Sequence, residues 1–257
     1  MGSLGLEPNR KRVIVVTPPM SDTDGAGAPS SSARIVTVTM NPALDIATST
    51  EVVMPTDKIR CGAARYDPGG GGINVALVAC ALGAPVVAMF PAGGASGDLV
   101  TEMLDAAGLP LRRIRTAEAT RESFTVNECR TERQYRFVLP GPAPSAAEQE
   151  ECLHQLRSVA ASADYVVASG SLPPNVSPDF YNRIADVCAQ LDTRLILDTS
   201  GGGLQHLPGA TSRPPSRPST PSAGSPPTRP VRGSARRAHD LLGTSVGTAV
   251  HRIRRLH

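Results

Sequence analysis

The sequence predicts an α/β fold built on a mostly parallel sheet, and three features of the chain lead to this prediction. Aromatic residues make up only 3% of the 257 residues and Trp is absent, so the core must be built from Val, Ile, Leu and Ala. Such residues suit parallel strands that helices cover on both faces. Apolar runs of strand length alternate with segments of helical spacing. Four consecutive glycines separate one of these strands from the helix that follows it.

Candidate elements follow one another from residue 34 to residue 198. The expected strands are 34–40, 86–90, 164–169 and 194–198, with 123–129 and 134–139 as a strand pair and 46–53 and 59–67 as short strands within a small lid at 46–67. The expected helices are 73–82, 98–107, 146–161 and 178–190. Strand–helix–strand connections of this kind predict parallel pairing with right-handed crossovers.

The two ends of the chain lack this pattern. Residues 1–33 are rich in Gly, Pro, Ser and Asp, and we expect a disordered leader there. Residues 207–257 are dominated by Pro, Ser, Arg, Gly and Thr and are expected to form a disordered tail, because they offer too little apolar area to offset the entropy of ordering. Residues 34–206 are therefore expected to form the single folded domain.

Charge and composition exclude several classes of protein. From 208 to 257 there are nine Arg and one Asp, a net charge of +8, whereas the rest of the chain carries −5. Nucleic-acid binding by this tail is not expected, since it lacks interleaved aromatic residues. The apolar stretch 73–82 is too short to cross a bilayer, which takes ~20 residues. Five cysteines without a C-x-x-C pair favour reduced thiols in a cytoplasmic protein and predict no zinc site.

The segment Pro68–Asn74 (PGGGGIN) is the strongest local signal of a binding site. Glycines at a strand-to-helix loop let the backbone approach a ligand, and the N–H groups of Gly70, Gly71 and Gly72 would point at it. The helix start favours hydroxyls or anions, and Asn74 adds a donor and an acceptor. The segment is neither a dinucleotide fingerprint nor a P-loop. A flexible turn is the alternative, but a mere turn does not require four glycines opening a helix.

Three polar side chains follow predicted strands. Asp45 comes after the first strand, Ser171 after 164–169, and Asp198 ends 194–198. Ligands of open α/β sheets bind at the carboxyl ends of the strands. Asp45 is a candidate for sugar hydroxyls and Asp198 for a metal–phosphate site. On local grounds, helix caps or ordinary turns explain each of the three equally well.

Four basic residues form a further candidate set, namely Lys58, Arg60, Arg121 and Arg136. Arg binds phosphate in a bidentate manner and Lys binds it as a point charge. Taken singly, each of them is more often a solvated surface charge.

Several motifs occur together and in order along the chain. They are NPALD (41–45), KIRC (58–61), PGGGGINVA (68–76), TRES (120–123), SGSLPP (169–174) and LDTSG (197–201). From Arg34 to about His206 the chain resembles the pfkB family of ribokinase-type carbohydrate kinases, and within it the minor 6-phosphofructokinase branch. Members related to 1-phosphofructokinases usually carry a Lys in the glycine run, which is absent here.

The resemblance implies a ribokinase-like three-layer fold with a small β lid. It also implies ATP-dependent phosphorylation of the 1-hydroxyl of fructose 6-phosphate, with Mg²⁺, in a homodimer joined through the lid. The implied site residues are Asp45, Gly70, Gly71, Gly72 and Asn74 for the sugar hydroxyls, Arg121 and Ser171 for the 6-phosphate, Lys58 and Arg60 on the lid, and Asp198 beside the Mg–ATP phosphates.

One departure from the family is large. The family's Gly-rich GxGD loop, which supplies the catalytic Asp, does not occur in the sequence, and Gly25–Ala28 (GAGA) has no Asp at its fourth position. The match is interrupted after about residue 206, so we expect a truncated domain, a tail read out of frame, no catalytic residue in this chain and no activity of the chain alone. A non-catalytic sugar-phosphate-binding protein, an enzyme completed by a second polypeptide, and a tagatose-6-phosphate or fructose-1-phosphate kinase remain open.

Overall fold

The computed structural model describes residues 12–16 and 34–199, and the rest of the predicted leader, GAGA and the predicted tail lie outside the described residues. Its elements are β1 (Arg12–Val16), β2 (Ile35–Val38), β3 (Ala43–Thr50), β4 (Arg65–Gly69), α1 (Gly71–Ala81), β5 (Val86–Ala92), α2 (Gly94–Ala106), β6 (Leu111–Arg115), β7 (Arg121–Glu128), β8 (Gln134–Val138), α3 (Ala146–Ala160), β9 (Tyr165–Ser169), α4 (Phe180–Gln190) and β10 (Arg194–Thr199).

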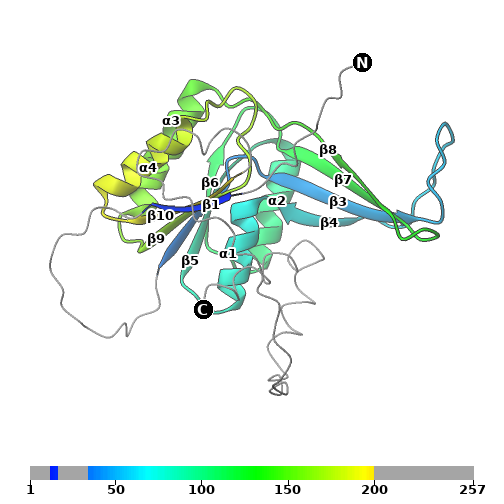
Figure 1. Cartoon of the computed structure of the whole chain (residues 1–257), viewed down its shortest axis with the longest axis horizontal. Helices are drawn as coiled ribbons and strands as arrows, with labels where there is room; N and C mark the ends of the chain where they lie inside the picture. Colours follow the sequence, from blue (N-terminus) through cyan, green and yellow to red (C-terminus); the bar gives the residue numbers. More distant parts are fainter. Residues whose placement is uncertain (1–11, 17–33, 200–257) are drawn as a thin grey trace, which may run out of the picture.

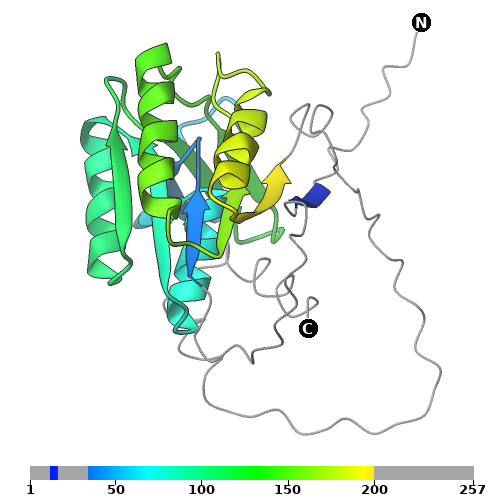
Figure 2. The same cartoon turned by 90° about the vertical axis from the view of Figure 1, so that its left-hand side faces the viewer.

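The fold is the predicted α/β fold with three layers (Figures 1 and 2). The main sheet has the strand order β1-β10-β9-β2-β5-β6, and every neighbouring pair except β1–β10 is parallel. Helices α3 and α4 contact each other on one face, while α1 packs on β2, β5 and β9 from the other. The carboxyl ends of the parallel strands therefore meet at one edge, where the site is expected.

Two buried clusters explain why the sheet needs helices on both sides. In β2 and β5, Val36, Val38 and Met89 belong to the cluster under α3 and α4, whereas Ala88 and Phe90 belong to the cluster under α1 and α2. Successive side chains of a strand point to opposite faces, so an aliphatic strand without polar alternation must be covered twice.

The second sheet, which we call the lid, has the order β4-β3-β7-β8 and extends away from the main sheet (Figure 1). The predicted lid covered only 46–67, but the structure adds β7 and β8. These two strands pair with each other as expected, and the pairing is antiparallel. The strand predicted at 46–53 runs from Ala43 to Thr50. In place of the strand predicted at 59–67, β4 begins only at Arg65 and ends at Gly69. The difference arises because β3 is parallel to the distant β7, a pairing that local pattern does not reveal.

Two strands lie where the sequence predicts none. The prediction of a wholly disordered leader is wrong for β1, which pairs antiparallel with β10 at the edge of the main sheet. Its four apolar residues, VIVV, suit a strand once a partner edge is present. Strand β6 pairs parallel with β5 and was missed because Arg112, Arg113 and Arg115 interrupt its apolar pattern.

The glycine segment is more regular than the predicted loop. Strand β4 runs to Gly69 and α1 begins at Gly71, so only Gly70 lies between them. Helix α2 likewise begins at Gly94, earlier than the predicted 98, and α4 begins later than predicted, at Phe180.

The helices and the cysteines bear on two further predictions from the sequence. Within the described ranges, none of the helices has the length and apolar character needed to span a bilayer. Cys152 and Cys188 are buried, and burial raises the pKa of each thiol to about 12. Cys61 and Cys129 are exposed on the lid.

Candidate functional site

The start of α1 packs directly against two strand ends. A Cβ atom on Gly72 would lie 2.5 Å from Thr39 Oγ1 and 2.7 Å from the Val38 carbonyl oxygen, and one on Gly71 would lie 2.4 Å from Ser169 Oγ. Gly70 has a φ of 128°, which L side chains rarely adopt. The glycines are therefore required by close backbone contact, and the contact holds the first N–H groups of α1 at the carboxyl edge of the sheet.

One hydrogen bond joins α1 to one of these strand ends, and another closes the first turn of the helix. The Ile73 N–H donates to Thr39 Oγ1 at 2.8 Å, and the Asn74 N–H donates to the Gly70 carbonyl at 2.9 Å. Asn74 lies in the first turn of α1, at the helix start where it was predicted, and its side chain is half-buried.

Asp198 lies next to this helix start through Ser169. The Ser169 hydroxyl donates to Asp198 Oδ2 at 3.2 Å, and the Gly170 N–H donates to the Asp198 carbonyl at 3.0 Å. The other carboxylate oxygen, Asp198 Oδ1, is buried and has no hydrogen-bond partner among the described residues. A free, buried carboxylate oxygen at the carboxyl edge of the sheet is suited to a cation or a ligand hydroxyl.

Asp45 occupies a different position from the one predicted. It lies within β3 of the lid, opposite Asp67 and Ser123, and not at the carboxyl end of a main-sheet strand. A cap is therefore excluded for it, because no helix begins there. It still reaches the glycines, since a Cβ on Gly69 would lie 2.4 Å from Asp45 Oδ2.

The charge of Asp45 is set by two opposing effects. Burial raises the pKa of this carboxyl, and the positive charges of Arg121 and Arg136 partly offset the rise. Burial also lowers the pKa of Arg121, against the opposing charge of Asp45. A half-buried carboxylate facing a half-buried guanidinium makes this corner polar and water-poor.

Arg121 and Ser171 are joined through Asn41. Arg121 Nη2 donates to the Asn41 carbonyl at 3.2 Å, and Asn41 Nδ2 donates to Ser171 Oγ at 3.1 Å. Arg121 Nη1 also donates to the Leu139 carbonyl at 3.4 Å and to Ser123 Oγ at 3.3 Å. Arg121 lies at the start of β7 and Ser171 two residues after β9, so the lid and the main sheet meet here.

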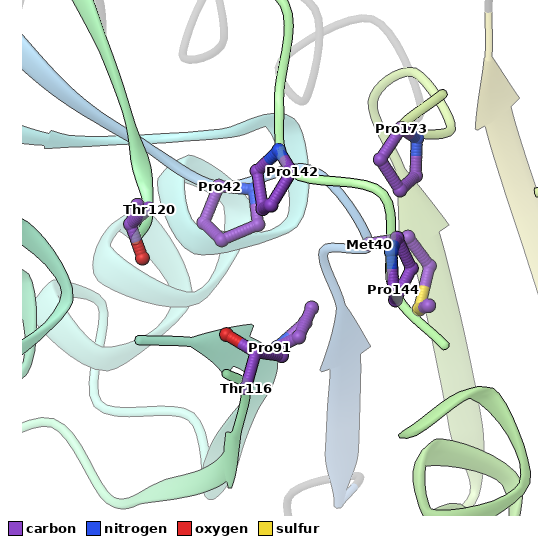
Figure 3. Close-up of a pocket in the computed structure, with 8 residues that line it drawn as sticks. All are labelled: Met40, Pro42, Pro91, Thr116, Thr120, Pro142, Pro144 and Pro173. Carbon is purple, nitrogen blue, oxygen red and sulfur yellow. The ribbon is translucent and has the colours of Figure 1, made fainter. Parts of the chain in front are cut away.

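An apolar pocket adjoins this junction, since its lining includes Met40 and Pro42 on either side of Asn41 and Thr120 before Arg121 (Figure 3). Its lining residues are Met40, Pro42, Pro91, Thr116, Thr120, Pro142, Pro144 and Pro173. Five of the eight are prolines, and the fixed φ angle of Pro42 makes the backbone directly after Asn41 stiff.

Lys58 and Arg60 are not brought to the site within one chain. Both are exposed on the segment 51–64, which follows the end of β3 opposite to Asp45 (Figure 1). The Arg60 carbonyl accepts a hydrogen bond from Thr50 Oγ1 at 3.2 Å, which ties this segment to the lid.

Glu128 holds the same segment from the other side. Its side chain is buried, Oε1 accepts from the Val53 N–H at 2.9 Å, and Oε2 accepts from the Tyr135 hydroxyl at 3.4 Å and from Thr131 Oγ1. These hydrogen bonds, led by that of Thr131, lower the pKa of Glu128 below its usual value. Its stabilising effect is therefore present above the usual pKa of a glutamate and is lost as the pH falls through the lowered one.

Replacing Glu128 with glutamine is expected to release the segment that carries Lys58. A glutamine keeps an oxygen for the Val53 N–H but removes the negative charge, so this hydrogen bond becomes weaker. Its amide nitrogen is a donor, so the Thr131 and Tyr135 hydroxyls would have to reorient and accept. Hydrogen exchange at pH 7 should become faster at the Val53 amide, and acidification of the unmodified protein should have the same local effect. Glu102→Gln on the exposed face of α2 is the control, and equal exchange in both variants would contradict this account.

Sequence reasoning missed three residues of the site, namely Thr39, Asn41 and Ser169. The sequence carries a signal for two of them, because Asn41 is the first residue of the NPALD motif and Ser169 is the first residue of SGSLPP. Thr39 has no signal in the sequence, since its role depends on the contact between β2 and α1.

Comparison with known proteins places this geometry in a family. Residues 38–212 match the model of the pfkB family carbohydrate kinases. The "ATP-dependent 6-phosphofructokinase isozyme 2" of Mycobacterium tuberculosis H37Rv is 62% identical over 185 residues, which cover 72% of this chain and 55% of that protein. The "D-tagatose-1-phosphate kinase" of Klebsiella oxytoca is 31% identical over 173 residues, which cover 67% of this chain and 56% of that protein.

Solved structures agree with the sequence relatives. Phosphofructokinase-2 from Escherichia coli in complex with fructose 6-phosphate superposes with a TM-score of 0.64 at 37% identity, covering 67% of this chain and 56% of that one. The same enzyme is also known in a tetrameric inhibited form. The chain thus spans somewhat more than half the length of the relatives it matches. With its fold, its glycine-rich helix start and the family match over most of its described residues, the chain belongs to the pfkB family of carbohydrate kinases.

Proposed function

We propose that the described residues form the sugar-phosphate half of the site of an ATP-dependent 6-phosphofructokinase, which converts fructose 6-phosphate to fructose 1,6-bisphosphate. The observation that carries the proposal is the meeting of Arg121, Ser171 and Asp45 at the glycine start of α1. The names of the M. tuberculosis and E. coli relatives support it.

The parts of the site suit the two ends of such a sugar. Arg121 and Ser171 offer donors to the 6-phosphate, for which the guanidinium fork is well shaped. Asp45 can accept from sugar hydroxyls, while the N–H groups of Gly70–Gly72 and the Asn74 amide contribute donors.

Asp198 is the residue that would face ATP and Mg²⁺. When bound, ATP supplies the phosphoryl group, and Mg²⁺ neutralises its charge. Among the described residues there is no cluster of three or more His, Cys, Asp or Glu side chains suited to a metal ion. A single carboxylate fits Mg²⁺ only as one ligand among waters and phosphate oxygens, which is its common mode of binding. The unpartnered Oδ1 of Asp198 is available for this role.

The experiment is calorimetric titration of the chain with fructose 6-phosphate, followed by a coupled assay with ATP. We expect binding of the sugar phosphate without turnover, because the sequence contains no GxGD loop to supply the catalytic Asp. Absence of binding would contradict the proposal that fructose 6-phosphate is the substrate. Turnover by this chain alone would contradict the proposal that the described residues form only the sugar-phosphate half of the site.

Two alternatives predict different outcomes in the same experiment. A non-catalytic binding protein would still bind fructose 6-phosphate after addition of the missing part of a relative, but would show no turnover. A kinase for another phosphosugar, in line with the name of the K. oxytoca relative, would prefer tagatose 6-phosphate or a sugar 1-phosphate in competition.

The lid is proposed to join two copies of the chain. Tyr66, Ile46, Phe124 and Phe137 lie opposite one another in a row across its four strands. Tyr66, Phe124 and Phe137 are 46%, 38% and 55% exposed, so the row offers an apolar strip to a second copy. In such a dimer Lys58 and Arg60 would serve the partner's site instead of their own. Sedimentation of Phe137→Glu, which we expect to be monomeric, tests this part.

A cytoplasmic location belongs to the same proposal. Both substrates carry charges that keep them from crossing a bilayer, so the enzyme must share their compartment.

A further inference from the structure

Asn41 touches both residues to which we assign the 6-phosphate, yet it has no role of its own so far. Its side chain donates to Ser171 Oγ at 3.1 Å and its main chain accepts from Arg121 Nη2 at 3.2 Å. We propose that Asn41 is a positioning residue that sets the polarity of Ser171 and thereby makes this corner selective for a phosphate. The inference rests on the proposed function and deepens it.

The argument begins with the hydroxyl of Ser171. A serine hydroxyl has one proton to donate and two lone pairs that accept. Because Asn41 Nδ2 donates to Ser171 Oγ, one lone pair is occupied and the proton is directed elsewhere. A phosphate offers only acceptors at neutral pH, so a serine held as a donor matches it.

Packing fixes the plane of the Asn41 amide. A Cβ on Gly141 would lie 2.1 Å from Asn41 Oδ1, so the backbone at 141 packs directly on the amide. Pro42 directly follows Asn41 and Pro142 directly follows Gly141, so a proline with a fixed φ angle adjoins each of the two residues that meet here (Figure 3). An amide enclosed in this way is preorganised, and a ligand need not order it on binding.

Two unsatisfied atoms mark the same corner as a place for a ligand or ordered water. Asn41 Oδ1 and Arg121 Nε are both buried, and neither has a hydrogen-bond partner in the described part of the chain. Buried polar atoms are usually paired, so a pair of orphans on neighbouring residues indicates that something polar completes the network.

The decisive variant is Asn41→Asp. A carboxylate fills nearly the same space, but it accepts the Ser171 proton, which turns the serine lone pairs outward, and it places a negative charge beside the phosphate. We expect the affinity for fructose 6-phosphate to fall by more than about a hundredfold in Asn41→Asp, since like charges in contact cost several kcal/mol. In Asn41→Ala it should fall by only about tenfold, the scale of one lost hydrogen bond.

A merely structural role would reverse this order. If Asn41 only filled space, the nearly isosteric Asp would be tolerated better than Ala. Ser171→Ala and the double variant Asn41→Ala/Ser171→Ala complete a double-mutant cycle. Because Asn41 acts through Ser171, we expect Asn41→Ala to cause no further loss of affinity in the Ser171→Ala background. Asn127→Asp is the matched control, as Asn127 is an exposed lid residue that donates to the Thr48 carbonyl.

The measurements are calorimetric titrations of the full chain with fructose 6-phosphate and with inorganic phosphate, after thermal melts have shown that each variant folds. Should Asn41→Ala fail to fold, Asn41→Asp and Ser171→Ala still give the comparison. Wild-type affinity in Asn41→Asp, or additive losses in the cycle, would overturn the inference and leave the proposed function standing. If the unmodified chain binds neither probe, the proposed function itself fails.

Discussion

Replacing Gly72 with alanine is expected to lower the Tm by roughly 2–12 °C. The added Cβ would lie 2.5 Å from Thr39 Oγ1 and 2.7 Å from the Val38 carbonyl, and the second of these is main chain that cannot rotate away. Overpacking of this kind costs about 1–3 kcal/mol, and each kcal/mol shifts the Tm by about 2–4 °C in a domain of this size. A thermal melt followed by circular dichroism measures the effect.

The control for this prediction is Gly62→Ala. A Cβ there would meet only Ser49, with the nearest atom at 3.6 Å, which is an ordinary contact. The two variants make the same chemical change, and they differ in whether α1 must move off β2. Equal melting temperatures for them would show that α1 does not start against the sheet as described.

The second large effect is expected at Arg121. Arg121→Lys keeps the charge but loses the fork that bonds the Asn41 and Leu139 carbonyls together. Hydrogen bonds to charged groups contribute about 1.5–3 kcal/mol, so the affinity for fructose 6-phosphate should fall by about 10- to 150-fold in a calorimetric titration.

Arg183→Lys serves as the matched variant for Arg121→Lys. Arg183 pairs with Glu150 on the surface between α3 and α4, away from the lid. The Arg183→Lys variant should bind fructose 6-phosphate with the affinity of the unmodified chain. A similar loss of affinity in both variants, or no loss in Arg121→Lys, would contradict the assignment of Arg121 to the 6-phosphate.

The sequence was sufficient for four strands of the main sheet, β2, β5, β9 and β10, because each of them is a predominantly apolar run. Aliphatic runs such as those at 86–90 and 164–169 need helices on both faces, and that requirement alone predicts the layers. The glycine run, Ser171 and Asp198 lie at the carboxyl edge of the main sheet, where the sequence placed them, since parallel strands all end there.

The lid could not be predicted in the same way. Strand β3 pairs with β7, and nothing in the residues near Asp45 reveals that partner. Asp45 was therefore assigned to the end of a strand although it lies inside one. Strand β6 was hidden by arginines, one of which, Arg113, uses its length to bond the Ala92 carbonyl and Asp98.

The antiparallel pairing of β1 with β10 has a consequence for any assembly with a second polypeptide. The outer N–H and C=O groups of β10 can bond only one strand at a time. Strand β1 pairs with them from Leu195 to Thr199, with Val13 opposite Asp198. A complementing fragment that extends the sheet at this edge must therefore displace β1 by strand exchange. The rate of that assembly should become independent of the fragment's concentration once release of β1 is the slow step.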